Sequence, residues 1–152
     1  MRRAIEIARL TAMIDHAGGP FGCVVVRDEA VVAEGANRVL ADHDPTSHAE
    51  MNAIREACSQ LGTHNLSGCI LYTSGEPCPM CYAACCWAHV DAIYFASTCE
   101  DAHQFGDFDD TAMFESIRLP ITDRTIVATE LLRDEMLQLW KTFQQDENRA
   151  RY

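Results

Sequence analysis

The chain has 152 residues, of which 48% are apolar and 23% are charged, a size and composition typical of one globular domain with a full hydrophobic core. No stretch reaches the roughly 18 consecutive apolar residues of a membrane span, which argues against a membrane protein. The net charge of -11 argues against a nucleic-acid partner, because phosphate binding requires a basic surface and the 12 basic residues are scattered.

The N-terminus and the cysteines indicate a reducing compartment. The first residues carry charge, and Arg9 and Asp15 interrupt any apolar run of the signal-peptide type. Eight cysteines are enough for disulfides, but Cys23, Cys58 and Cys69 fall in strand or helix patterns that favour buried free thiols. We therefore expect a cytoplasmic protein.

The first part of the chain predicts a helix followed by a β-hairpin. Apolar residues recur at helical spacing over 4–17, and Gly18-Gly19-Pro20 ends that pattern. Two β-rich runs, 22–27 and 30–34, flank Asp28-Glu29 and are typical of a hairpin.

Strands and helices alternate in the rest of the chain. After an irregular polar stretch over 37–47, a helix is expected to begin at His48, with Thr46 or Ser47 as its cap, and to end before Gly62. The segment 97–110 is polar and acidic. The other expected elements are strands over 69–73, 91–96 and 125–129 and helices over 79–88, 111–117 and 130–148. This order predicts an α/β fold, a three-layer α/β/α sandwich with a mixed five-stranded sheet, in one domain spanning residues 1–152.

Two segments carry residue types that bind zinc, and each begins a predicted helix. They are His48-Ala49-Glu50 and Pro77-Cys78-Pro79-Met80-Cys81. The Cys-x-x-Cys spacing at a helix start lets both sulfurs converge on one ion, and the positive end of the helix favours thiolates. If the two helices start side by side, His48 supplies a third ligand. Three protein ligands leave the fourth tetrahedral position to water, which marks a catalytic zinc site.

Glu50 follows His48 by two residues and is expected to lie beside the metal rather than on it. Zinc lowers the pKa of bound water to about 7, and a neighbouring carboxylate then takes the proton and delivers it to a substrate nitrogen. The two segments together match the signature of zinc-dependent nucleobase deaminases. They therefore predict hydrolytic deamination with Glu50 as the proton carrier.

Other interpretations of the Cys-x-x-Cys pair are a redox centre or half of a structural zinc site. Cys85 and Cys86 are close in sequence, but on a helix they point away from a site at its start. A redox or structural role also leaves Glu50 without a function. The presence of both segments, each opening a helix and separated by one strand, favours the catalytic site.

The sequence resembles the cytidine/deoxycytidylate deaminase superfamily, and within it the bacterial guanine deaminases, over nearly its whole length. The zinc segments are common to the superfamily and imply only deamination, whereas Phe108-Asp109-Asp110 and a terminal Tyr152 are narrower features. The resemblance implies Zn2+ as cofactor, a small purine as substrate, and a homodimer whose C-terminal segments are exchanged between subunits. The shared segments are 18–22, 34–37, 44–50, 71–81 and 108–110.

The resemblance also implies a set of substrate-binding residues. Asn37 matches an asparagine before the zinc helix that contacts the purine. Asp110, or its neighbour Asp109, matches a carboxylate that binds the amidine edge of guanine, a task that suits a group accepting two parallel N–H donors. Phe21 matches a ring that stacks on the base, and Trp87 matches an aromatic residue of the pocket wall.

Tyr152 matches a tyrosine that closes the pocket, and in an exchanged dimer Asp110 and Tyr152 would serve the partner's site. Each of these residues also has a structural interpretation. Asn37 would shape a turn, an acidic pair at 109–110 would cap the next helix, Trp87 would belong to the core, and Tyr152 to a disordered tail.

The leading hypothesis is therefore deamination of guanine to xanthine and ammonia, with water adding at C2 and Glu50 protonating N3 and then the leaving amine. The alternatives are deamination of guanosine or of another 2-amino heterocycle, and Tyr152 folded over the pocket would leave no room for a ribose. Editing of tRNA adenosine fits the negative charge poorly. A non-catalytic zinc or redox module is the alternative outside enzymes.

Overall fold

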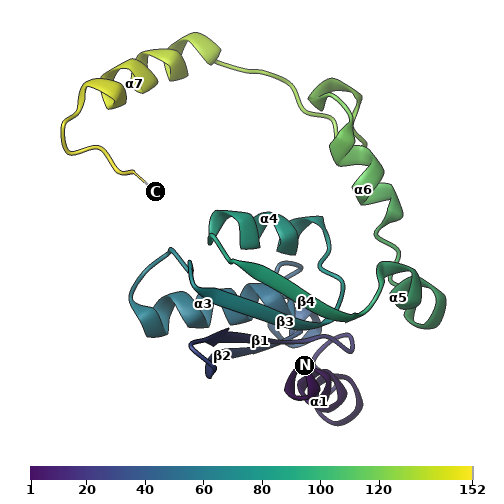
Figure 1. Ribbon diagram of the computed structural model, residues 1–152. Coiled ribbons are helices and arrows are strands. Elements are labelled where there is room, and N and C mark those ends of the chain that lie inside the picture. The colour runs from purple at the N-terminus through teal and green to yellow at the C-terminus, as the bar shows by residue number, and fades with distance from the viewer. Residues whose placement is uncertain (152) are drawn as a thin grey trace. The chain divides into compact units, whose positions relative to one another are not determined.

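The computed structural model of the protein describes residues 1–151, which form two compact units (Figure 1). The first unit spans Met1–Asp110, and the second begins at Thr111. Tyr152 lies outside the described residues. Within residues 1–151, no helix is both long enough and apolar enough to cross a membrane.

The first unit is built on a mixed sheet, as predicted. Strand β1 is antiparallel to both β2 and β3, whereas β3 and β4 are parallel, and the strand order is β2-β1-β3-β4. The strands are β1 (Gly22–Arg27), β2 (Ala30–Ala36), β3 (Cys69–Gly75) and β4 (Ala92–Ser97).

Helices cover both faces of this sheet, with α1 on one side and α3 and α4 on the other (Figure 1). The predicted three-layer arrangement is therefore confirmed. The helices of the first unit are α1 (Arg2–Leu10), continued by a π-helical turn (Thr11–Asp15), α2 (Val39–Asp42), α3 (Ala49–Leu61), α4 (Pro79–Trp87) and α5 (Cys99–Gly106).

The alternation of side chains along β1 divides the core into two layers. Val24 packs with Ala4 and Ile7 of α1 on one face. Cys23 and Val25 point to the opposite face, where they meet the apolar residues of α3 and α4. Because side chains of a strand alternate between faces, one buried strand holds both helical layers in register.

The helix α3 lies close against β2, and Gly35 permits this approach. A Cβ atom at Gly35 would overlap the carbonyl oxygen of Ala49 and the amide nitrogen of Ala53. Ala49 and Ala53 are themselves fully buried, so small residues on both elements bring the start of α3 onto the sheet. This contact positions His48 and Glu50, which belong to the same helix start.

The segment 97–110 contains a helix that the sequence analysis missed. Helix α5 begins with a capping box, in which the Thr98 hydroxyl accepts a hydrogen bond from the amide of Asp101, while the Asp101 carboxylate accepts one from the amide of Thr98 at 2.8 Å. The acidic residues that make this stretch polar are therefore stabilising residues of a helix N-terminus.

The expected cap of α3 was also wrong. His48 itself is the N-cap residue, without a side-chain capping bond. The Ser47 hydroxyl instead donates to Asp42 at 2.8 Å, and the Thr46 hydroxyl donates to Asp44 at 2.8 Å. Both side chains therefore stabilise the loop before the helix rather than the helix end.

The second unit contains two α-helices and one short 3-10 turn within residues 111–151, and none of these residues is buried. The predicted fifth strand over 125–129 is wrong, and the sheet has four strands among the described residues. A β-branched composition favours a strand, but a strand also needs a partner for its backbone groups, and 125–129 pairs with none. The elements are α6 (Thr111–Arg118), the 3-10 turn (Ile121–Asp123) and α7 (Arg133–Gln145).

We predict that Gly35→Ala destabilises the protein by about 1–3 kcal/mol, the usual cost of forcing a methyl group into a packed core. The helix start that carries His48 and Glu50 must then move away from β2, so zinc retention should fall as well. Thermal unfolding and zinc content measure the two effects. Glu34→Gln, one residue earlier on the same strand and paired with exposed Arg3, is the control and should change both little. A Gly35→Ala protein with the stability and zinc content of the wild type would contradict this account.

Candidate functional site

The three predicted zinc ligands meet at the starts of two helices. His48 is the N-cap residue of α3, Cys78 is the N-cap residue of α4, and Cys81 lies in the first turn of α4. The Nδ1 atom of His48 lies 3.6 Å from the sulfur of Cys78 and 3.5 Å from that of Cys81. The three ligand atoms lie within 4.8 Å of one another. The structure thus brings together residues that are about 30 positions apart in the chain.

These separations fit a zinc ion. Zinc binds cysteine sulfur at about 2.3 Å and histidine nitrogen at about 2.0–2.1 Å, so a tetrahedral arrangement places nitrogen and sulfur roughly 3.6 Å apart. The donor set of one imidazole and two thiols is also one that zinc prefers. Because His48, Cys78 and Cys81 provide three ligands, a tetrahedral ion bound here keeps one position for water.

The electrostatics of the site favour a thiolate at Cys78. A hydrogen bond from Cys81, followed by the contact with His48, lowers the pKa of Cys78 to about 4. The same hydrogen bond raises the pKa of Cys81, and the contact with Cys78 raises the pKa of His48. A cysteine at a helix start is also stabilised as an anion by the helix dipole. Cys78 is therefore ionised at neutral pH and suited to a cation.

Glu50 lies beside the three ligands and is 4% exposed. Its Oε1 atom accepts a hydrogen bond of 2.6 Å from the Thr73 hydroxyl, and its Oε2 atom accepts one of 3.4 Å from the Cys81 sulfur. Burial raises the pKa of Glu50, and the bond from Thr73 acts in the opposite direction. A carboxylate with a raised pKa accepts a proton more readily near neutral pH.

A cavity opens at this cluster and includes several of the predicted substrate residues. It is lined by Phe21, His48, Glu50, Glu76, Cys78, Phe108 and Asp110. Asp110 is partly buried, and this burial, together with the nearby Cys78, raises its pKa. The neighbouring Asp109 is exposed. Of the two candidate carboxylates, Asp110 is therefore the one that reaches the cavity.

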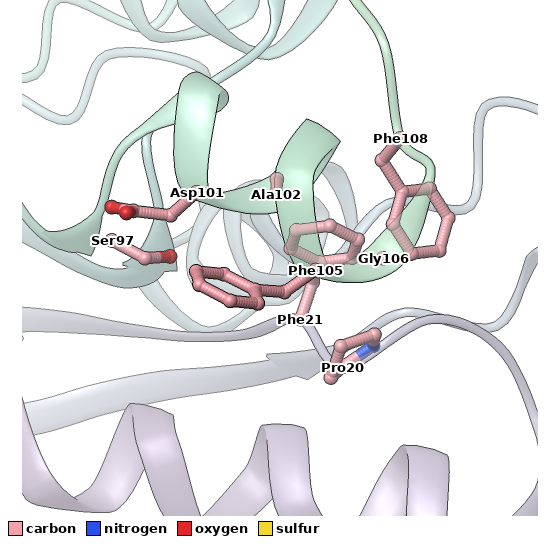
Figure 2. Close-up of a pocket in the computed structure, with 8 residues that line it drawn as sticks. All are labelled: Pro20, Phe21, Ser97, Asp101, Ala102, Phe105, Gly106 and Phe108. Carbon is pink, nitrogen blue, oxygen red and sulfur yellow. The ribbon is translucent and has the colours of Figure 1, made fainter.

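Aromatic rings form one wall of the cavity. Phe21 and Phe108 pack edge to face with ring centres 5.1 Å apart. The same two rings line a neighbouring pocket of about 230 Å3, together with Phe105 of α5, and Figure 2 shows Asp101 and Ser97 at one end of that pocket and Phe108 at the other. Phe108 was not assigned a role from the sequence, although it belongs to the segment that resembles guanine deaminases.

Glu76 joins the cysteine loop to the start of α5. Its carboxylate accepts a hydrogen bond of 3.0 Å from the amide of Cys99, and its own amide donates one of 2.8 Å to the carbonyl of Ser97. The segment that leads to Phe108 and Asp110 is thereby tied to the loop that carries Cys78. This anchoring is the role that a residue next to metal ligands commonly has.

Three predicted substrate residues do not line the cavity. Asn37 is buried, donates its backbone N–H to the Phe21 carbonyl at 3.0 Å, and accepts a bond from Val39 at its side-chain oxygen. Trp87 is 69% exposed at the last residue of α4, at the opposite end of that helix from Cys78. Asp109 is exposed and does not line the cavity, and Tyr152 lies outside the described residues. The substrate roles of these residues stay predictions.

Comparison with known proteins defines the family. The model of the "Cytidine and deoxycytidylate deaminase zinc-binding region" matches residues 1–97, which include the sheet, α3 and α4. The chain therefore belongs to the cytidine and deoxycytidylate deaminase family, and its cofactor is zinc.

Individual relatives are more specific. The chain is 44% identical to the guanine deaminase of Bacillus subtilis over 146 residues, which are 94% of this chain and 92% of that protein. The X-ray structure of a guanine deaminase from Bacillus subtilis matches with a TM-score of 0.93 at 42% identity, covering 99% of this chain and 95% of that one. A tRNA-specific adenosine deaminase of Aquifex aeolicus is 40% identical over 78 residues, 51% of this chain and 52% of that protein.

We predict that Cys78→Ser weakens zinc binding by more than about 100-fold, because even loss of a supporting residue around a metal site costs roughly 10- to 100-fold. Competition with a chelator and elemental analysis of the purified protein measure this. Cys86→Ser is the matched control, since Cys86 lies on the same helix and is exposed. Equal zinc affinity in the two variants would show that Cys78 is not a zinc ligand.

Proposed function

We propose that the protein is a zinc-dependent guanine deaminase that converts guanine and water to xanthine and ammonia, with His48, Cys78 and Cys81 as the zinc ligands and Glu50 as the proton carrier. The observation that carries this proposal is the cavity in which Asp110 faces the predicted ligands and Glu50. It is supported by 44% identity to a guanine deaminase over 94% of the chain. The net charge of -11 also disfavours tRNA.

The proposed reaction needs a nucleophile, a proton carrier and a group that orients the purine. Zinc, when bound, supplies an activated water as the nucleophile. Glu50 takes the proton from that water at the oxygen nearest Cys81, transfers it to N3 of guanine as C2 is attacked, and later protonates the departing amine. Its raised pKa suits a group that accepts and donates a proton in the same cycle.

Asp110 is proposed to bind the amidine edge of guanine. As a carboxylate, it accepts hydrogen bonds from N1–H and from the 2-amino group. Adenine presents an acceptor at N1 and no 2-amino group, so the same carboxylate would disfavour it. Phe21, with Phe108 packed against it, is proposed to hold the flat face of the base.

The activity is tested by measuring ammonia release from guanine, guanosine, cytosine, adenine and triazines with zinc-loaded protein. We expect guanine to be the best substrate.

Glu50→Gln should lower kcat by about 100-fold or more, the usual contribution of a general acid–base group, while zinc content stays the same. Glu56→Gln, on the exposed face of the same helix, is the control. Ammonia release from another base and none from guanine would overturn guanine as the substrate. Wild-type turnover by Glu50→Gln would overturn the role of Glu50 as proton carrier.

The role of Asp110 has a separate test. Asp110→Asn should lower kcat/KM for guanine by about 10- to 100-fold, because an amide cannot accept two donors in parallel and leaves a polar group unpaired. Asp109→Asn is the neighbouring control and should stay within about threefold of the wild type. If the two variants rank in the opposite order, Asp109 and not Asp110 binds the base.

We further propose a homodimer in which the residues after Asp110 contribute to the partner's site, with Tyr152 closing the pocket. The second unit supports an association of this kind, since none of residues 111–151 is buried and apolar side chains such as Ile126, Val127 and Trp140 are exposed. A unit without buried residues needs another surface to cover its apolar groups. A monomeric mass in solution would contradict the proposal.

A cytoplasmic location is also proposed. It is supported by the eight cysteines, all of which are free, since an oxidising compartment favours disulfides. Cell fractionation tests it, and recovery of the protein outside the cytoplasm would contradict it.

A further inference from the structure

We propose that Thr73 is a positioning residue for deamination: its hydroxyl holds one oxygen of the Glu50 carboxylate so that the other oxygen faces the metal ligands. This inference rests on the proposed function of Glu50. Thr73 is not among the residues that line the cavity, and its hydroxyl reaches the cavity residue Glu50, so it would act only through Glu50.

The position of Thr73 in the sheet determines where its hydroxyl points. Thr73 lies on β3 and pairs with Cys23 of β1 on one side and with Phe95 of β4 on the other. Burial alternates along β3, which places Thr73 on the same face as Leu71 and Cys69, towards α3. A β-branched side chain on a central strand has a restricted χ1 angle. The hydroxyl is therefore held by the sheet rather than by the helix that carries Glu50.

The bond from Thr73 to Glu50 is short and fully enclosed. Thr73 is 0% exposed and Glu50 is 4% exposed, and their oxygen atoms lie 2.6 Å apart. Hydrogen bonds to a carboxylate in a dry environment are stronger than neutral ones, and a buried carboxylate oxygen without a partner is costly. The bond thus selects one orientation of the carboxylate.

Packing alone does not select this orientation. The last torsion of a glutamate joins sp3 and sp2 carbons, so its preferred values are broad and roughly two-fold. The carboxylate plane can therefore rotate with little cost unless a hydrogen bond holds it. The bond from Thr73 reaches Oε1, which leaves Oε2 on the side of Cys81, where the proton is taken up in the proposed reaction.

Thr73 is also the side-chain donor that remains to Glu50 once the metal ligands are in use. Within residues 1–151, the side chains that donate to the Glu50 carboxylate are those of Thr73 and Cys81. A cysteine that binds zinc does so as a thiolate, which has no proton to donate. Cys23 and Cys85 are near Glu50, but burial raises the pKa of each thiol, so neither adds a charge that would orient the carboxylate.

The test compares Thr73→Val, which keeps the shape but removes the hydroxyl, with Thr73→Ser, which keeps the hydroxyl. In zinc-loaded protein, we expect Thr73→Val to lower kcat for guanine by about 10- to 100-fold, the loss typical of a misplaced catalytic group, with KM within about twofold. Thr73→Ser should recover kcat to within about threefold of the wild type. A kcat for Thr73→Val within twofold of the wild type, or a loss that Thr73→Ser does not recover, overturns the proposal.

A crystal structure of each zinc-loaded variant gives a readout that does not depend on activity. Thr73→Val should show the Glu50 carboxylate rotated or in two conformers, and Thr73→Ser should show the wild-type orientation. An unchanged single orientation in Thr73→Val overturns the proposal. If Thr73→Val does not fold, Thr73→Ala and Thr73→Ser replace the pair, because they differ by one hydroxyl, and equal kcat values for these two variants are then the contradicting result.

Thr11→Val is the matched control for loss of a buried threonine hydroxyl. Thr11 is 2% exposed and follows α1, the helix on the opposite face of the sheet from α3. Thr11→Val should lower stability without changing kcat.

The turnover of the wild type, measured in parallel, separates the two proposals. If Thr73→Val turns guanine over as fast as the wild type, only the role of Thr73 is contradicted. If the wild type does not act on guanine, the proposed function is contradicted. In the latter case the orientation of Glu50 in the crystals still decides whether Thr73 holds it.

Discussion

The convergence of two helix starts on one small volume is the constraint on which the rest of the structure depends. His48 and Cys78 both have extended backbone angles at the N-cap positions of their helices, so each side chain extends beyond its helix start. Helices α3 and α4 lie on the same face of the sheet, and small residues such as Gly35 and Ala49 bring α3 close to it. Two helix dipoles then direct their positive ends at the thiolates and the carboxylate of the site.

The grouping of His48, Cys78 and Cys81 could be predicted from the sequence, whereas the contacts that support Glu50 could not. The histidine, the cysteine pair and their helices are local patterns, each readable within a few residues of sequence. The bond between Thr73 and Glu50 joins positions 23 residues apart on different elements, and only the packing of α3 against the sheet brings them together. The only sequence feature that points to Thr73 is the strand periodicity, which places its side chain on the buried face. It does not identify Glu50 as the partner.

The errors in the predicted fold have a related cause. Helix α5 was not predicted, although Thr98 and Asp101 form a capping box that local sequence spacing can reveal, because the segment is polar and acidic and shows no clear apolar periodicity. The fifth strand was predicted from composition alone, and Ile126 and Val127 have no strand partner among the described residues. A strand depends on pairing between distant segments, whereas a capped helix start depends on neighbours.

The chemistry and the selectivity of the proposed enzyme rest on different kinds of structure. Glu50 and the three proposed metal ligands lie on or next to helices that pack on the sheet, so their geometry follows from the core of the first unit. Asp110 lies at the end of that unit, after α5, and is held near the site through Glu76 and the rings of Phe21 and Phe108. Under the proposed role of Asp110, a change in the length or sequence of 99–110 alters which amino group is presented to Glu50 and leaves the proposed metal ligands in place. The segment 99–110 adds no residue to the buried core, so the proposed selectivity can vary without disturbing His48, Glu50 and the cysteine pair.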